Sequence, residues 1–278
     1  MNVGKYIYYL FSIGELILGT SNWVTAMSLF LPHSSSKSAI IQFRKSKVLL
    51  RVRGAMDLWI AKETFLDRFY ERYGTVVQDG WVVVDIGAGI GDFSISVAKG
   101  RPSTRVYAFE PFPESFALLQ ENLQLNQIIN VQAFPQAICG ESGTLYLDLS
   151  KGEPVQFSTT KVAEPERTLP VPCLSLGDAF ALLGIDYCDL LKLDCEGAEY
   201  DILFNAPHSV LHKVRHIIME YHEGITPYGA QDLIIYLSER GFDVHTYPNP
   251  VHRHLGFLYA FVPSGPAGRR QNAKGGAL

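Results

Sequence analysis

The chain has 278 residues, of which 47% are hydrophobic and 19% are charged, so it can bury one sizeable core in a single α/β domain with short appendages. Its formal net charge of −4, without a dense Lys/Arg stripe, gives no reason to expect nucleic acid as a partner. The four cysteines show neither C-x-x-C nor zinc spacing and predict reduced, mostly buried thiols of a cytoplasmic protein: Cys139, Cys173, Cys188 and Cys195.

Residues 1–45 are predicted to be an N-terminal apolar segment and a linker. The apolar side chains of the segment lie roughly on one helical face: Ile7, Leu10, Phe11, Ile17 and Leu18. Glu15 and several polar residues interrupt the run, so no unbroken stretch is long enough to span a bilayer. We expect a helix packed on the domain or on a membrane surface rather than a secretory signal. The composition of residues 32–38 is typical of a linker.

A hairpin and a helix are predicted next. Residues 40–43 and 48–52 are short apolar runs on either side of a basic turn, which favours a β-hairpin. Residues 61–73 predict a helix that ends at Gly74. Its charged residues are expected on one face, and an apolar stripe on the other: Phe65, Leu66, Phe69, Tyr70 and Tyr73.

Residues 81–94, with the sequence WVVVDIGAGIGDFS, carry the strongest signal in the chain. The run of β-branched residues fits a strand buried on both faces, and the alternate glycines permit a tight turn close to a ligand. The spacing G-x-G-x-G, with Asp92 where the dinucleotide fingerprint has a small residue, differs from that fingerprint. Asp85 before the loop fits a cationic ligand without a pyrophosphate, such as S-adenosylmethionine. The alternative is a β–α turn that binds nothing.

A second acid follows at the separation typical of a nucleotide site. Residues 104–110 predict the next strand, which ends in Glu110. In doubly wound sheets, an acid at this place accepts hydrogen bonds from ribose hydroxyls. Phe112, next to Pro111, could lie against an adenine. A solvated glutamate at a strand end is common, so the prediction depends on the complete set of strand, glycine loop, helix at 92–99, strand and acid.

The remaining elements alternate along the chain. Helices are predicted at 114–125, from Ser175 or Asp178 to 183, and at 228–240. Strands are predicted at 131–138, 188–194, 215–222, 242–247 and 256–262.

Two further segments complete the prediction of the fold. Residues 143–149 alternate in polarity and favour an antiparallel excursion, and the polar, proline-containing residues 151–170 predict a long loop. Residues 264–278 are rich in Gly, Ala and Pro and predict a disordered tail. We therefore expect, in residues 46–263, a doubly wound Rossmann-like sheet that is mostly parallel with an antiparallel C-terminal edge strand.

Ionisable residues end the fourth and fifth predicted strands of the main sheet. Lys192 and Asp194 share one face of a strand, as do Glu220 and His222, and we expect all four near the glycine loop. His222 is the candidate base, because an imidazole titrates near neutrality, and a hydrogen-bonded structural histidine is the alternative. Lys192 could instead form a purely structural ion pair. Glu196 could instead be present because a helix dipole favours an acid in the first turn of a helix. A divalent metal on three of these groups stays open, although no ligand spacing requires one.

These blocks resemble the FkbM-type methyltransferases, a branch of the S-adenosylmethionine-dependent Rossmann-like enzymes. The resemblance covers roughly residues 55–262, and its matching blocks are residues 84–91, 108–111, Asn122 with Asn126, 191–199 and 218–222. The block Lys-x-Asp-x-Glu-Gly-x-Glu is more specific than the glycine loop. Ile90 stands where family members commonly have Asn, a small departure that leaves cofactor binding expected.

The resemblance implies methyl transfer from S-adenosylmethionine, usually to a hydroxyl oxygen. The cofactor-binding residues it implies follow three of the strands: Asp85, Gly87, Ala88, Gly89, Gly91, Glu110, Pro111, Phe112, Asp194 and Glu196. The predicted catalytic residues are the second cluster, without a metal ion: His222, Asp194, Lys192 and Glu220.

The predicted function is O-methylation of a sugar, polyketide or lipid-like small molecule by a cytoplasmic enzyme. The expected partner is a small-molecule or glycan acceptor. Membrane contact through the N-terminal segment stays open. One alternative is a nicotinamide-dependent reductase on the same fold, which Asp92 disfavours. Another is a cofactor-binding scaffold without catalysis, which the acids at the strand ends disfavour. A nucleic-acid methyltransferase is disfavoured by the net charge and by the lack of an Asn-Pro-Pro-Tyr-type motif.

Overall fold

The computed structural model of the chain describes residues 3–31, 38–151, 159–160, 164, 166–249 and 255–263. Nearly all of the predicted linker at 32–38, much of the predicted loop at 151–170 and the predicted tail at 264–278 lie outside the described residues.

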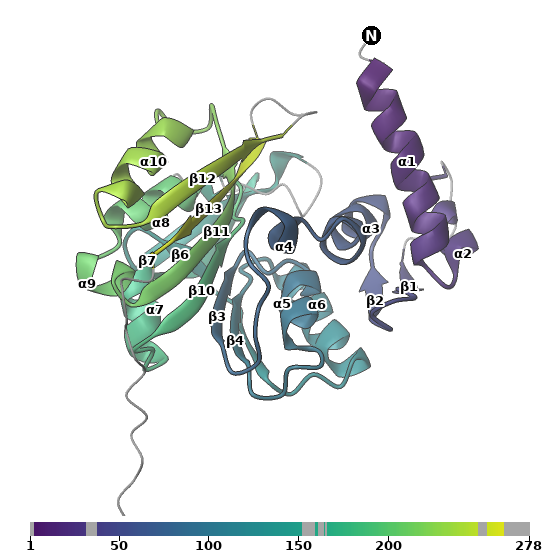
Figure 1. The fold of residues 1–278 in the computed structure, drawn as a ribbon, viewed down its shortest axis with the longest axis horizontal. Coiled ribbons are helices and arrows are strands. Elements are labelled where there is room, and N and C mark those ends of the chain that lie inside the picture. Colours follow the sequence, from purple (N-terminus) through teal and green to yellow (C-terminus); the bar gives the residue numbers. More distant parts are fainter. Residues whose placement is uncertain are drawn as a thin grey trace, which may run out of the picture.

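A seven-stranded sheet forms the centre of the molecule (Figure 1). In spatial order its strands are β12 (Asp243–Pro248), β13 (Leu255–Phe261), β11 (Val214–His222), β10 (Cys188–Leu193), β3 (Val82–Ile86), β4 (Arg105–Phe109) and β5 (Val131–Phe134). The strands from β11 to β5 pair in parallel, whereas β13 is antiparallel to both β11 and β12. The predicted doubly wound, mostly parallel sheet with an antiparallel C-terminal edge is confirmed.

Helices cover both faces of this sheet because alternate side chains of the central strands are apolar on both sides. Val84 and Ile86 pack with α7 (Leu176–Leu182), α8 (Glu199–Asn205), α9 (His208–Leu211) and α10 (Ala230–Ser238). Val83 and Ala108 belong to the clusters on the other face, which include α5 (Asp92–Ala98) and α6 (Pro113–Leu125). Ser175 caps α7 by accepting from the backbone N–H of Asp178, as its predicted start requires.

A second, four-stranded sheet has the order β6 (Ala137–Cys139), β9 (Thr168–Ser175), β7 (Gly143–Asp148) and β8 (Thr159–Thr160), with a 3-10 turn at Leu149–Lys151. The antiparallel excursion predicted at 143–149 is confirmed by the pairing of β7 with β9. The single strand predicted at 131–138 is wrong, since the chain turns around Pro135 and enters the second sheet. β9 is missed by the sequence, because Pro170 and Pro172 favour a loop there.

Two cysteines are paired. Cys139 and Cys173 form a disulfide between β6 and β9, which are adjacent strands and bring the two Cα atoms to 6.1 Å. The prediction that all four cysteines are reduced thiols is wrong for this pair, because 34 residues separate the two in sequence and only strand pairing brings them together. Cys188 and Cys195 are free.

The N-terminal segment forms α1 (Val3–Gly19) and α2 (Trp23–Ser28), followed by the confirmed hairpin of β1 (Ala39–Gln42) and β2 (Leu49–Val52). Leu16 and Ala26 are fully buried in a cluster that also contains Ile95 of α5, so the segment packs on the main domain. The apolar face singled out in the sequence does not pack on the domain, since Leu10, Phe11 and Leu18 are 69%, 72% and 78% exposed. Among the described helices, none is both long enough and apolar enough to cross a membrane.

The helix predicted at 61–73 is broken into three pieces: α3 (Ala55–Lys62), a π-helical turn η1 (Glu63–Asp67) and α4 (Phe69–Tyr73). Arg68, with φ of 54°, separates the last two pieces. Lys62, at the end of α3, is buried and forms ion pairs with Glu15 and Asp67. A π-helical turn in a helix is frequent at functional sites, and this one borders the cavity described below.

Candidate active site

A cavity of about 340 Å³ lies at the carboxyl ends of β3, β4, β10 and β11. Its floor is the glycine loop and the residues that follow β4 and β10, and its opposite wall is built from α3, η1 and α4. Ligands of doubly wound sheets bind at this edge, where loops after the strands meet. The sequence prediction of a site there agrees with the position of the cavity.

The glycine loop needs two of its glycines for different reasons. Gly87 has φ of +74°, and a Cβ built on it would lie 1.8 Å from the backbone oxygen of Asp194. Gly89 has φ of +55° and meets no atom within 4 Å, so its surface is open to the cavity. Gly91 does not line the cavity, since it caps α5 and faces Leu119. Gly87 and Gly89 thus shape the floor, and Gly91 packs the loop against α6.

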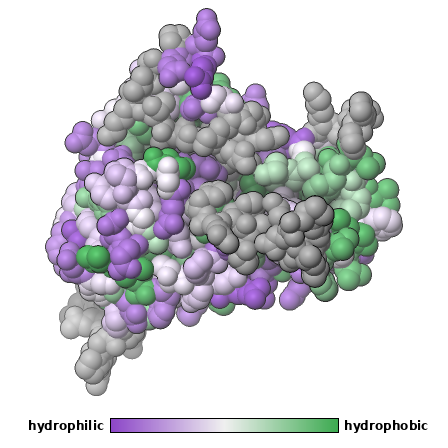
Figure 2. All heavy atoms as spheres, turned by 90° about the horizontal axis from the view of Figure 1, so that it is seen from above, coloured by the Kyte–Doolittle hydropathy of each residue, from purple (hydrophilic) through white to green (hydrophobic). Residues whose placement is uncertain are grey.

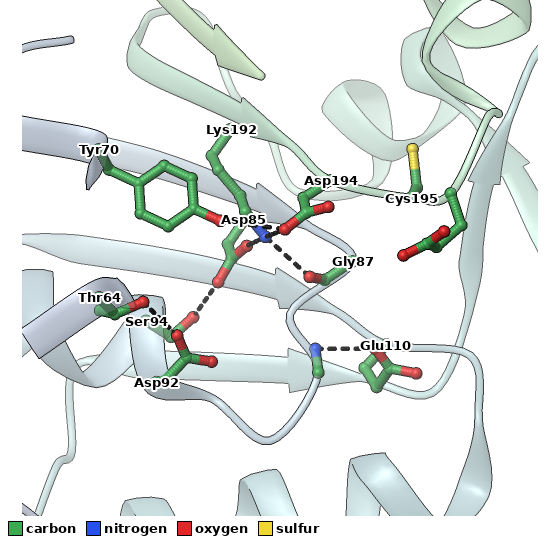
Figure 3. A network of polar contacts seen from close by, with 12 residues as sticks. Thr64, Tyr70, Asp85, Gly87, Asp92, Ser94, Glu110, Lys192, Asp194 and Cys195 are labelled. Carbon is green, nitrogen blue, oxygen red and sulfur yellow. Dashed lines mark hydrogen bonds and ion pairs between the residues drawn. The ribbon is translucent and has the colours of Figure 1, made fainter. Parts of the chain in front are cut away.

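Glu110 ties the glycine loop to the end of β4 (Figure 3). Its Oε2 accepts from the backbone N–H of Gly89 at 2.8 Å, and its Oε1 accepts from the N–H of Phe112 at 2.9 Å. Burial raises the pKa of Glu110 to about 7. Because a carboxylate oxygen can accept more than one hydrogen bond, both oxygens keep accepting capacity beside Pro111 and Phe112, which line the cavity.

Asp85 lies beneath the cavity and does not line it. Its carboxylate accepts from the Ser94 hydroxyl at 2.7 Å and lies 3.1 Å from Lys192 Nζ (Figure 3). Lys192 also donates to the backbone oxygen of Gly87 at 2.8 Å. Burial acts to lower the pKa of Lys192, but Asp85 and Asp194 outweigh it and raise the pKa above its usual value. The expected direct contact of Asp85 with a cationic ligand is therefore replaced by a buried ion pair that holds the loop.

Of the two carboxylates that pair with Lys192, Asp194 faces the cavity and Asp85 does not. Its Oδ2 accepts from the Tyr70 hydroxyl at 3.0 Å and lies 3.8 Å from Lys192 Nζ. Lys192 Nζ lies 5.7 Å from the centroid of the Tyr70 ring. This arrangement links β10 to α4 and leaves about a quarter of the Asp194 side chain exposed to the cavity.

His222 is held between two glutamates behind the cavity wall. Its Nδ1 lies 3.3 Å from Glu199 Oε1 and its Nε2 lies 3.5 Å from Glu196 Oε2. Burial acts to lower the pKa of His222, but the Glu199 carboxylate and the other acids raise it to about 9. The imidazole is then protonated at neutral pH and does not line the cavity, so the alternative of a structural histidine fits it better than the role of base.

Glu196 lies in a tight turn between β10 and α8. Its φ is 55°, a region that residues other than glycine rarely adopt, and Gly197 follows with φ of 103°. Glu199 supports the turn by accepting from the backbone N–H groups of Cys195 at 3.0 Å and Gly197 at 2.9 Å. The turn brings Glu196 to the lining of the cavity.

Two more carboxylates converge on the same space. Glu63 accepts from Trp59 Nε1 at 2.9 Å, and burial raises the pKa of Glu63 to about 8. Glu220 lines the cavity, and burial together with the charge of Asp194 raises its pKa well above its usual value. The sequence singled out Glu220 but assigned no role to the Glu63 carboxylate itself, because η1 cannot be recognised from the helical pattern. Within the described part of the chain, no three His, Cys, Asp or Glu side chains are placed to hold a metal ion.

Three features together define an S-adenosylmethionine-dependent methyltransferase of the Rossmann-like class. They are the antiparallel strand β13 beside β11, the glycine loop after β3 and the acid that follows β4. Residues 85–244 match the Methyltransferase FkbM domain, and the chain belongs to this family. Because the chain belongs to this family, the alternative of a nicotinamide-dependent reductase is dropped.

Three relatives illustrate the family. The 31-O-demethyl-FK506 methyltransferase FkbM of Streptomyces tacrolimicus is 25% identical over 69% of this chain and 84% of that protein. Methyltransferase sdnD of Sordaria araneosa is 28% identical over 67% of this chain and 82% of that protein. The 2-O-methyltransferase NoeI of Sinorhizobium fredii is 25% identical over 50% of this chain and 63% of that protein.

S-adenosylmethionine is the cofactor, and it supplies a methyl group on a positively charged sulfur. The residues present fit it. The open face of Gly89 admits a ligand next to the backbone, and the Glu110 oxygens can accept from ribose hydroxyls. Phe112 offers an aromatic face, and the Asp194 carboxylate offers negative charge in the cavity.

Proposed function

We propose that the protein methylates a hydroxyl oxygen of a sugar, polyketide or lipid-like small molecule. Two relatives support oxygen as the acceptor atom, since their names specify the 31-O and 2-O positions. The cavity supports an acceptor with several hydroxyl groups, because Glu63, Asp194 and Glu220 offer hydrogen-bond acceptors and Trp59 and Phe257 offer apolar faces.

The observation that carries the proposal is the state of Glu220. Its side chain lines the cavity, close enough to Asp194 and His222 for their charges to act on it. In its ionised form, a carboxylate whose pKa is raised by burial is a stronger base than an ordinary glutamate. A hydroxyl must lose its proton while its oxygen forms the new bond to carbon, and we assign that proton to the Glu220 carboxylate.

The other predicted catalytic residues take supporting roles in this proposal. Asp194, which follows the neighbouring strand β10, orients the acceptor hydroxyl or the cationic part of the cofactor beside Glu220. Lys192 positions Asp194 and the carbonyl of Gly87. His222 fixes Glu196 and, being protonated, lowers the repulsion among the neighbouring acids.

The test is transfer of a labelled methyl group by the purified protein to a panel of glycosides, polyols and hydroxylated lipids. Each acceptor is paired with an analogue in which the reactive hydroxyl is removed. Glu220→Gln is expected to lower turnover about 10²- to 10⁴-fold while cofactor binding stays unchanged. Glu239→Gln, at an exposed glutamate on the C-terminal end of α10, is the matched control and is expected to keep full turnover. A product methylated on carbon or nitrogen, or full turnover by the Glu220 variant, would contradict the proposal.

A further inference from the structure

The outer face of the N-terminal helices is apolar. Figure 2 shows green atoms gathered at the right side of the molecule, the side on which α1 and α2 lie. The most exposed apolar side chains of this region lie in and after the two helices: Leu10, Phe11, Leu18, Trp23, Val24, Phe30 and Leu31. A contiguous exposed apolar surface on a soluble domain indicates an interaction site.

α1 leaves several of its large apolar side chains exposed, unlike an ordinary surface helix. Ser12 and Leu16 are buried on the side that faces the domain, and the half-exposed Glu15 pairs with Lys62 at 2.7 Å. Glu15 is the only charged residue between Tyr8 and Leu31. A helix that packed for stability alone would bury its apolar residues and expose its charges. With 17 residues, α1 is suited to lying on a bilayer and not to crossing it.

A basic turn adjoins this apolar surface. Arg44, Lys45 and Lys47 are exposed in the turn between β1 and β2. The backbone N–H of Arg44 donates to the oxygen of Gly19 at 2.8 Å, which places the turn at the C-terminal end of α1. The whole chain has a net charge of −4, so this local positive charge stands out. Lysine and arginine near an anionic leaflet contribute about 1 kcal/mol each to membrane binding.

We propose that α1, α2 and the turn at 44–47 form a docking surface for an anionic membrane. A bilayer offers both an apolar layer for the exposed side chains and negative head groups for the basic turn. A second copy of the chain would bring another basic turn of the same sign to the interface, which would be unfavourable. The proposal is independent of the methyl acceptor.

Binding is measured by sedimentation of the full chain with vesicles of phosphatidylcholine alone and of phosphatidylcholine mixed with phosphatidylglycerol. The wild type is expected to sediment with the anionic vesicles, and less so in high salt. Leu10→Ser, Phe11→Ser and Leu18→Ser together are expected to weaken binding at least about tenfold, because three large side chains no longer enter the bilayer. The control changes three exposed apolar residues elsewhere, Val76, Leu182 and Ile129, to serine and is expected to bind as the wild type does.

A second variant keeps the test decisive if the triple serine variant fails to fold. Lys45→Glu with Lys47→Glu is expected to weaken binding to the anionic vesicles at least about tenfold, because both side chains are exposed and their charge is reversed. Thermal unfolding checks that each variant is folded. Lack of wild-type binding to the anionic vesicles would overturn the proposal. A wild-type dimer that the triple serine variant converts to a monomer would also overturn it, in favour of a self-association surface.

Discussion

Replacing Lys192 with methionine tests whether a buried cation holds the glycine loop in place. The change leaves the Asp85 carboxylate, which has no exposed surface, with the Ser94 hydroxyl as its remaining side-chain donor. It also removes the donor to the carbonyl of Gly87. Taking away one partner of a buried ion pair costs about 3–5 kcal/mol, because the remaining charge is buried without compensation.

The free energy of unfolding is measured in urea by tryptophan fluorescence. A loss of about 3–5 kcal/mol corresponds to a fall in Tm of roughly 6–20 °C for a domain of this size. Lys213→Met is the control, since Lys213 is partly exposed, pairs with the fully exposed Asp186 at 3.7 Å and donates to the backbone oxygen of Ile185 at 3.0 Å, and the change should cost less than about 1 kcal/mol.

A double substitution separates the ion pair from a loss of packing. Adding Asp85→Asn to Lys192→Met should recover at least about half of the lost free energy, because neither charge is then buried. If Lys192→Met unfolds within about 1 kcal/mol of the wild type, or if the second substitution recovers nothing, the reasoning is refuted.

Three other predictions concern the site. Glu110→Gln should weaken the binding of S-adenosylmethionine about tenfold or more in calorimetry, because a charged acceptor is lost. Since the pKa of Glu110 is raised to about 7, wild-type affinity should fall between pH 8 and pH 6, and a flat profile would refute its role. For His222, burial lowers the pKa but Glu199 raises it from 6.5 to about 9, so its stabilisation is complete below pH 6.5 and is lost as the pH rises through 9. His222→Gln should therefore lower the urea midpoint most near pH 6 and least near pH 10, and an equal loss at both would count against the ion cluster. Gly87→Ala should abolish cofactor binding or folding, whereas Gly143→Ala, with no atom within 4 Å of its Cβ, should behave as the wild type.

The parallel part of the fold could be predicted because its signals are local. The apolar run of β3, the glycine turn and the acid after β4 are close in sequence, and each has one simple structural explanation. The second sheet could not be predicted as well. Pro170 and Pro172 in β9 oppose a strand on propensity, and the pairing with β7 overrides that preference.

The site was predicted by position more accurately than by role. Glu110, Asp194 and Glu220 lie at the predicted edge and line the cavity. Asp85 and His222 have the predicted residue types at the predicted strands, but their partners decide what they do, and the partners come from distant segments. A sequence pattern places a carboxylate at a strand end, yet it does not show whether a lysine from the next strand neutralises it.

The contact between α1 and α3 bears on how this enzyme is prepared for study. The rings of Tyr8 and Tyr9 lie 6.0 Å and 5.5 Å from the ring of Trp59, which lines the cavity and donates to Glu63. A protein shortened to begin at residue 38 lacks both tyrosines. It also lacks Glu15, the ion-pair partner of Lys62, so the side chain of Lys62 becomes more exposed. Removing the N-terminal helices for easier purification therefore changes one wall of the cavity. Kinetic constants measured on the shortened protein then describe an altered active site.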